Sequence, residues 1–232
     1  MRYETPETIG EAVSLLAIAE GSGRVLAGGT DLLVQLRSGV VEPGVVVDIK
    51  KIAETREITA ENGGFRVGAA VTGAELDEHK ALKKLWPGVV EAVELIGSTQ
   101  IQGRASMGGN LCNASPAADS VPALIAAGAL CHIAGLDGER TLPVEGFCTG
   151  PGMTNLKSGE FLVSFTLPPR PPYSGDAYLR FIPRTEMDIA VVGVGVSLTL
   201  DSNGNCILAR VGLGAVAATA LLVTEAAEAL IG

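Results

Sequence analysis

Residues Ser98 to Asp119 read STQIQGRASMGGNLCNASPAAD, the most informative segment of the chain. The segment has few large apolar side chains, so we expect it to lie outside the core, and its residue choices are too specific for a linker. Gly108 and Gly109 permit positive φ and a close approach of the backbone to a ligand. Pro116 presets φ for the first turn of a helix, and the alanine-rich residues 117–127 favour that helix.

The pattern around Gly108 and Gly109 is typical of an anion site. Backbone N–H groups in a glycine-rich turn just ahead of a helix hold phosphates. A second stretch of the same kind, VLAGGTDL at residues 25–32, runs from an apolar strand into two glycines. One such turn alone would favour a simple helix cap, but two predict a ligand with two phosphates held from both sides. The residues assigned to this cradle are Ala27, Gly28, Gly29, Thr30, Asp31, Ser106, Met107, Gly108, Gly109 and Asn110.

Side chains in the cradle are expected to differ in their roles. The hydroxyl of Thr30 or of Ser106 can satisfy phosphate oxygens. Asp31 is the unusual member, because a carboxylate repels a phosphate. We expect Asp31 to cap the following helix or to bond its own loop backbone instead.

Composition restricts the class of protein. At 232 residues, with 47% hydrophobic and 19% charged residues, the chain can bury a substantial core and is not disordered. A formal net charge of −9 disfavours nucleic acid binding, which needs a basic surface. The sequence has neither a Ser-His-Asp order, nor HExxH, nor a GxGxxG that opens a βαβ unit, so hydrolase and Rossmann chemistry are not predicted.

Cysteine and histidine spacing predicts no metal site. The four cysteines and two histidines show none of the spacings typical of zinc or iron–sulfur ligation. We expect the cysteines to be buried thiols in a reducing cytoplasm. The polar N-terminus lacks a signal-peptide pattern, and glycines or charges interrupt the long apolar stretches, so a cytoplasmic chain without a transmembrane segment is expected.

The order of expected helices and strands places the chain in the α+β class. Residues 1–55 are interpreted as a small α/β lobe, and residues 56–167 as a central α+β lobe with two hairpins. The proline-rich residues 168–172 predict a linker. Residues 173–232 are expected to form a small α+β C-terminal domain, an antiparallel sheet followed by a helix over 219–230.

Three segments together resemble a known family: Ala27 to Leu32, Gln100-Ile101, and Ser106 to Asp119, at the family's spacing. They look like the FAD-binding subunit of the molybdenum hydroxylases. This group includes xanthine dehydrogenase, nicotinate dehydrogenase, 4-hydroxybenzoyl-CoA reductase and aerobic carbon monoxide dehydrogenase. The resemblance covers essentially the whole chain and implies a two-lobed FAD-binding domain of the PCMH type. The family's C-terminal domain continues for several more helical turns, which predicts a last domain that is incomplete here or completed by a partner.

The resemblance also implies separate tasks for three subunits. A large subunit would hold the molybdenum cofactor and oxidise the substrate, and an iron–sulfur small subunit with [2Fe–2S] clusters would carry electrons to FAD on this chain. This chain would pass them to NAD, a quinone or oxygen, and would hold no catalytic residue and no metal of its own. A dimer of heterotrimers is the expected assembly.

Three further residues gain a role only from the resemblance. Asp119 matches a family position that contacts the flavin or its ribityl chain, with a helix-surface carboxylate as the alternative. Leu162 matches an apolar residue against the flavin, with an ordinary core residue as the alternative. Arg180 stands where xanthine dehydrogenases carry a lysine near the flavin ring. A cation there would favour the anionic reduced flavin.

The chain departs from the family pattern at several positions. Gln102 and Gly103 stand where many relatives have Arg and Asn. Ser98 stands where relatives of aerobic carbon monoxide dehydrogenase usually have His. Together with CNASP at residues 112–116 and TGPG at residues 149–152, this leans toward the dehydrogenases of xanthine, nicotinate and other N-heterocycles. Two alternatives stay open: an independent flavoenzyme with the same FAD domain and its own substrate pocket, and a flavin-free assembly or interaction protein that kept the scaffold.

Overall fold

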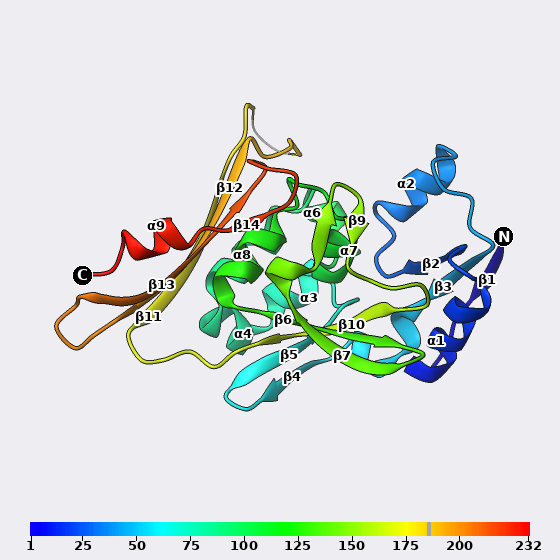
Figure 1. The fold of residues 1–232 in the computed structure, drawn as a ribbon, viewed down its shortest axis with the longest axis horizontal. Helices are drawn as coiled ribbons and strands as arrows, with labels where there is room; N and C mark the ends of the chain where they lie inside the picture. Colours follow the sequence, from blue (N-terminus) through cyan, green and yellow to red (C-terminus); the bar gives the residue numbers. More distant parts are fainter. Residues whose placement is uncertain (185–186) are drawn as a thin grey trace.

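The structure is a computed structural model that describes residues 1–184 and 187–232. Figure 1 shows an N-terminal unit at one end of the long axis, a C-terminal sheet at the other end and a central unit between them. The N-terminal unit has parallel strands in the order β1-β3-β2. Its elements are β1 (Arg2–Glu4), α1 (Ile9–Ile18), β2 (Gly23–Leu26), α2 (Leu32–Arg37) and β3 (Val45–Asp48).

The middle strand β3 forms the centre of the N-terminal unit, and all its residues are buried. Helix α1 covers it with the buried residues Ala12, Val13 and Leu16. The helix starts after Thr8, whose Oγ1 accepts a hydrogen bond from the N–H of Glu11 at 3.2 Å. In contrast, none of the residues of α2 is buried, although most of them are apolar.

The central unit is built on an antiparallel sheet with the order β4-β5-β10-β6-β7. Both predicted hairpins are confirmed, as the pairs β4–β5 and β6–β7. The strands are β4 (Ile58–Glu61), β5 (Gly64–Gly68), β6 (Leu130–Gly135), β7 (Gly138–Pro143) and β10 (Phe161–Leu167), with a separate ribbon of β8 (Cys148–Gly150) and β9 (Met153–Thr154). The helices are α3 (Gly73–Glu78), α4 (Lys80–Leu85), α5 (Pro87–Glu94), α6 (Thr99–Gln102), α7 (Met107–Cys112) and α8 (Ser120–Ala127).

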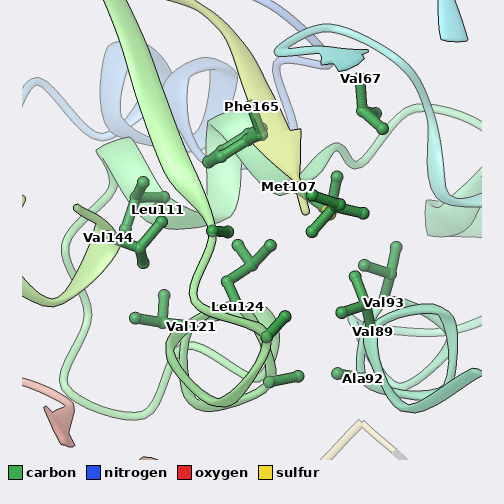
Figure 2. Packing of buried hydrophobic residues seen from close by; sticks show 14 of the residues in the cluster. Val67, Val89, Ala92, Val93, Met107, Leu111, Val121, Leu124, Val144 and Phe165 are labelled. Carbon is green, nitrogen blue, oxygen red and sulfur yellow. The ribbon is translucent and has the colours of Figure 1, made fainter. Parts of the chain in front are cut away.

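The main core lies between helices α5, α7 and α8 and strands β5 and β10, as Figure 2 shows. Met107 and Leu111 on one side of α7 are 1% and 0% exposed. The expectation that residues 98–119 lie outside the core was therefore wrong, because two apolar residues spaced four apart are enough to bury one side of a short helix. The helix expected after Pro116 begins only at Ser120.

The C-terminal unit is an antiparallel sheet of β11 (Ser174–Phe181), β12 (Val192–Leu200), β13 (Cys206–Gly214) and β14 (Leu221–Leu222), in that order. Its face against α8 is formed by backbone, because a Cβ atom at Gly195 or Gly212 would lie 2.5 or 2.3 Å from the carbonyl oxygen of Pro122. The two glycines are opposite each other in the β12–β13 ladder. The expected helix over 219–230 is shorter than predicted: β14 occupies its start, and α9 spans only Thr224–Glu228.

The predicted linker at residues 168–172 is a joint that packs against the central unit. The guanidinium of Arg170 lies 4.6 Å from the centroid of the Trp86 ring, and its side chain is 7% exposed. Arg170 Nη1 donates to the carbonyl oxygen of Leu85 at 2.6 Å and contacts Asp176 Oδ1 at 2.5 Å. We propose that the folding units divide at this segment and between residues 55 and 56. Within the described residues, no helix combines the length and the hydrophobicity needed to cross a bilayer.

Candidate functional site

The two glycine loops form walls of one cavity of about 560 Å³. The cavity lies between the N-terminal and central units, because residues of both line it, and its volume is typical of a small-molecule site. Met107, Asp119 and Arg180 are not among the lining residues. The other assigned residues line it: Ala27, Gly28, Gly29, Thr30, Asp31, Ser106, Gly108, Gly109, Asn110 and Leu162.

The first loop, residues 27–31, connects β2 to α2. Gly29 has a φ of +80°, a conformation that L side chains rarely adopt. A Cβ atom at Gly28 would lie 1.8 Å from the carbonyl oxygen of Arg104, so the two loops touch through their backbones. Lys50 Nζ donates to the carbonyl oxygen of Ala27 at 2.9 Å and thereby holds the start of the loop.

The second loop leads into α7. Ser106 Oγ accepts a hydrogen bond from the N–H of Gly109 at 3.1 Å and caps the helix. A Cβ atom at Gly108 would lie 2.3 Å from the carbonyl oxygen of Ala69, so this glycine is required by packing. A Cβ atom at Gly109 would meet only Ser106 Oγ, at 3.3 Å, so this glycine leaves room beside the cavity. Met107 points from the same turn into the core (Figure 2).

Asp31 behaves differently from the expectation. It occupies the N-cap position of α2, but its side chain makes no capping hydrogen bond. The carboxyl lines the cavity instead, and desolvation by the surrounding atoms raises its pKa above the ordinary value. The prediction of a side-chain cap was therefore wrong, and the negative charge of Asp31 belongs to the cavity wall.

Other charged side chains that line the cavity are Arg24, Lys157 and Glu160. Arg140 donates two hydrogen bonds to the carboxylate of Glu160, at 2.8 and 2.7 Å. These bonds hold the pKa of Glu160 below its ordinary value. The sequence reasoning missed Arg24 and Lys157. The available signal was weak: Arg24 is a cation just ahead of a phosphate loop, and Lys157 belongs to an ordinary polar turn.

Asp119 and Arg180 form an ion pair with each other. Arg180 Nη1 lies 3.1 Å from Asp119 Oδ2 and also donates to the carbonyl oxygen of Leu95 at 2.9 Å. Tyr178 donates its hydroxyl to Asp119 Oδ1 at 3.0 Å. The two charged side chains are only 8% and 13% exposed. Desolvation raises the pKa of Asp119, against the opposing effects of Arg180 and Tyr178.

Apolar and amide side chains complete the wall. Leu162 lies on β10, is 3% exposed and lines the cavity together with Ile96. Gln35 of α2 donates its amide to Asn113 Oδ1 at 3.1 Å and so connects the N-terminal unit to the residue that follows α7. Asn113 lies within the motif of residues 106–119, but the sequence reasoning missed Ile96 and Gln35, because no motif marks an apolar or amide residue whose role depends on tertiary contacts.

Two family models match the chain. The model described as the FAD binding domain in molybdopterin dehydrogenase matches residues 1–170. The model described as the CO dehydrogenase flavoprotein C-terminal domain matches residues 177–232. The chain belongs to this family. It is an FAD-binding subunit of the molybdenum hydroxylase type of oxidoreductase, as the sequence resemblance implied.

Relatives of this FAD subunit cover nearly its whole length. The xanthine dehydrogenase FAD-binding subunit of Escherichia coli O157:H7 is 37% identical over 219 residues, which are 94% of this chain and 74% of the relative. A solved carbon monoxide dehydrogenase from Hydrogenophaga pseudoflava, which lacks the Mo-pyranopterin moiety of the molybdenum cofactor, matches with a TM-score of 0.94 and 32% identity. That match covers 100% of this chain and 80% of the solved one. Quinoline 2-oxidoreductase from Pseudomonas putida 86 matches with a TM-score of 0.90 and 28% identity, over the same shares of the two chains, 100% and 80%.

The cavity of the FAD subunit fits this cofactor. Two glycine turns offer backbone N–H groups, and Thr30 and Ser106 offer hydroxyls, which are suitable donors for a pyrophosphate. Arg24 and Lys157 add positive charge, and the open space beside Gly109 admits a ligand close to the backbone. Among the described residues, Asp31 is the lining carboxylate without an ion-pair partner, since Arg140 neutralises Glu160.

Proposed function

We propose that this subunit transfers electrons from the [2Fe–2S] clusters of a small partner subunit, through its FAD, to an acceptor such as NAD, a quinone or oxygen. A large subunit with the molybdenum cofactor oxidises the substrate, and the assembly is a dimer of heterotrimers in the cytoplasm. Relatives named as an FAD-binding subunit and as a medium chain of dehydrogenases support separate tasks for separate chains. The four cysteines, all free thiols, fit a reducing compartment.

The pyrophosphate of FAD is held between loops 27–31 and 106–110. In the first turns of α2 and α7, the N–H of Leu33 already bonds Gly29 and that of Gly109 bonds Ser106, which leaves the N–H groups of Leu32, Met107 and Gly108 to donate to phosphate oxygens. The contact of Gly28 with the carbonyl of Arg104 keeps the two loops adjacent, so a single pyrophosphate can reach both. The cations Arg24 and Lys157 offset the charge of the phosphates.

The flavin ring lies toward Leu162 and Ile96, two large apolar residues of the cavity wall. Asp119 and Arg180 act at this end of the site, each through a neighbouring residue. Arg180 donates a hydrogen bond to the carbonyl oxygen of Leu95, which precedes the cavity residue Ile96. Asp119 precedes Ser120, whose N–H donates to Asn110 Oδ1 at 3.1 Å. The guanidinium favours negative charge on the ring, and the carboxylate of Asp119 moderates this effect.

FAD, when bound, supplies the chemistry that connects donors of single electrons to acceptors of electron pairs. The residues of this subunit bind and orient the cofactor, keep water from the apolar side of the site and set the local charge. None of them contacts the substrate of the large subunit in this proposal.

The substrate of the assembly is an N-heterocycle rather than carbon monoxide. Two observations support this part of the proposal. Identity to the xanthine dehydrogenase subunit is 37%, against 32% for the carbon monoxide dehydrogenase medium chain of Hydrogenophaga pseudoflava. Ser98 also replaces the histidine that the sequence resemblance associates with carbon monoxide oxidation.

The observation that carries the proposal is the single cavity with both glycine loops on its walls. The test is purification of the protein from its native host, with an absorption spectrum and a gel of the chains that co-purify. We expect flavin and iron–sulfur absorbance and two further chains. Anaerobic addition of NAD, a quinone analogue or oxygen to the reduced complex then identifies the acceptor that restores the oxidised spectrum.

Other outcomes of this purification are equally clear. Flavin on a lone chain that turns over by itself would indicate an independent flavoenzyme and contradict the partner assignment. A colourless chain that takes up no added FAD would contradict the cofactor role and indicate an assembly or interaction protein.

A further inference from the structure

Lys50 lies at the end of β3, in the short 3₁₀ turn Ile49–Lys51, and reaches the first glycine loop. Its Nζ donates to the carbonyl oxygen of Ala27 at 2.9 Å and lies 2.7 Å from Asp48 Oδ1. Parallel pairing of β2 with β3 places these residues together, because Leu26 is the register partner of Asp48. Lys50 therefore contacts the loop without lining the cavity.

Asp48 fixes the position of the Lys50 side chain. The Asp48 residue is 7% exposed, and its carboxylate accepts hydrogen bonds from the N–H of Lys50 at 3.0 Å and from the hydroxyl of Tyr3. Desolvation alone would raise the pKa of Asp48, but the hydrogen bonds from Lys50 and Tyr3 outweigh it and lower the pKa. The carboxylate is therefore charged at neutral pH, and it holds the ammonium group of Lys50 in one place.

Fixing the carbonyl of Ala27 also fixes the N–H of Gly28. The peptide bond between them is trans and planar, so its C=O and N–H point in opposite directions. The carbonyl points toward Lys50, which does not line the cavity, so the N–H points away from Lys50. Rotation of this peptide is also restricted by the close contact of Gly28 with the carbonyl of Arg104.

We propose that Lys50, held by Asp48, is a positioning residue that presents the N–H of Gly28 to a phosphate of FAD. This inference rests on the proposed function, in which loop 27–31 holds the pyrophosphate. Lys50 acts through the backbone and not as a phosphate ligand. Asp48 Oδ1, 2.7 Å from Lys50 Nζ, balances the charge of Lys50. Lys50 therefore promotes FAD binding by orienting the Ala27–Gly28 peptide and not by adding positive charge to the site.

The test compares Lys50→Met with Lys51→Met in the complex purified from its native host. Lys51 is the matched control, because it lies in the same turn and its side chain is 59% exposed. Its Nζ lies 4.0 Å from Glu7 Oε1, away from the glycine loop. FAD is removed, and the dissociation constant for added FAD is measured by titration of flavin absorbance. We expect Lys50→Met to weaken FAD about tenfold to a hundredfold, the range for loss of a hydrogen bond to a charged group, and Lys51→Met to leave binding unchanged.

Two further measurements separate positioning from a general loss of structure. The ³¹P resonances of bound FAD should shift in Lys50→Met and not in Lys51→Met. Lys50→Arg, which keeps the charge and can still donate to the Ala27 carbonyl, should recover part of the affinity. Asp48→Asn keeps Lys50 but weakens the contact that holds its ammonium group in place. We expect this variant to bind FAD about tenfold more weakly.

Unchanged affinity and unchanged ³¹P shifts in Lys50→Met would overturn the inference. If Lys50→Met does not fold, Asp48→Asn decides instead, and wild-type affinity in that variant overturns the inference. A wild-type complex that binds no FAD would contradict the proposed function itself, which separates the two failures.

Discussion

Two adjacent glycines in the second loop have different physical tasks. Gly108 has no room for a side chain, because a Cβ atom would lie 2.3 Å from the carbonyl oxygen of Ala69. Gly109 is less constrained, because the nearest atom to its Cβ would be Ser106 Oγ at 3.3 Å, a side-chain atom that can shift by a few tenths of an ångström. Gly108 is thus required for folding, whereas Gly109 is required only if a ligand uses the space beside it.

We predict that Gly109→Val and Gly108→Val fail in different ways. Gly109→Val should fold with a near-normal unfolding midpoint but weaken FAD by about tenfold or more, because the isopropyl group occupies the ligand's space. Gly108→Val should lose about 1–3 kcal/mol or more of stability through overpacking. Flavin absorbance per chain and thermal unfolding measure the two effects. Normal flavin content in Gly109→Val would remove this loop from the site.

The Arg140–Glu160 pair at the cavity wall predicts a pH-dependent contribution to stability. Arg140 lowers the pKa of Glu160, so the folded state favours the ionised carboxylate. This contribution is present above the ordinary glutamate pKa of about 4.3 and is lost as the pH falls through the lower pKa of the folded state.

At pH 7, Glu160→Gln should therefore have a free energy of unfolding about 1–2 kcal/mol lower than that of the wild type. This loss lies between the values for exposed and for buried ion pairs. The difference should shrink as the pH is lowered below 4.3, about the ordinary value for glutamate. Urea unfolding at a series of pH values measures it. A difference that stays constant down to acid pH would mean that the ion pair does not account for the effect of the substitution.

Residues of the site were predictable from the sequence where the groups that bind the ligand lie next to one another along the chain. The glycine loops each carry their donors within a few neighbouring residues, and both loops line the cavity. Lys50 was not predictable in this way, because its contact with Ala27 depends on the parallel pairing of β2 and β3. The same limit applies to Asp119 and Arg180, whose mutual contact joins the residue before α8 to β11.

At the scale of elements, the packing of the C-terminal sheet on α8 depends on backbone contact. Gly195 on β12 and Gly212 on β13 face the same carbonyl of Pro122, and Gly214 faces the Pro122 ring. Without Cβ atoms these strands approach the helix more closely than side chains would allow. The position of the sheet relative to the helix is therefore determined by a few glycines.

We predict that Gly212→Ala lowers the free energy of unfolding by about 1–3 kcal/mol or more, since its Cβ atom would lie 2.3 Å from the Pro122 carbonyl oxygen. Gly175→Ala on β11 is the matched control, because the nearest atom to its Cβ would be 3.9 Å away. That change should alter stability by less than about 1 kcal/mol. Thermal unfolding of both variants measures the contrast, and equal midpoints would show that the sheet can shift away from α8 without cost.

Element prediction succeeded where local patterns were complete. Both central hairpins form as expected. It failed where tertiary packing decided the outcome. The start of the expected C-terminal helix pairs instead with β13 as β14, because a neighbouring strand was available to bond it.

At the scale of the whole molecule, the two contacts between units are of different kinds. The N-terminal and central units share a small buried cluster and also enclose a cavity, beside which Gly28 lies close to Arg104 and Gln35 bonds Asn113. The central and C-terminal units meet through close packing of α8 on β12 and β13 (Figure 1). The order of expected helices and strands could predict the α+β class, but it could not predict which of the two contacts would enclose a cavity.

The joint at residues 168–172 has a practical consequence. Trp86 is the only tryptophan of the chain, it is 3% exposed, and its indole N–H donates to the carbonyl oxygen of Pro168 at 3.0 Å. Its ring also stacks beneath the guanidinium of Arg170. The tryptophan emission of the protein therefore comes from a single indole at a single place. The wavelength of that emission depends on the hydration of the indole, so it reports directly whether the joint stays packed when the protein is altered or unfolded.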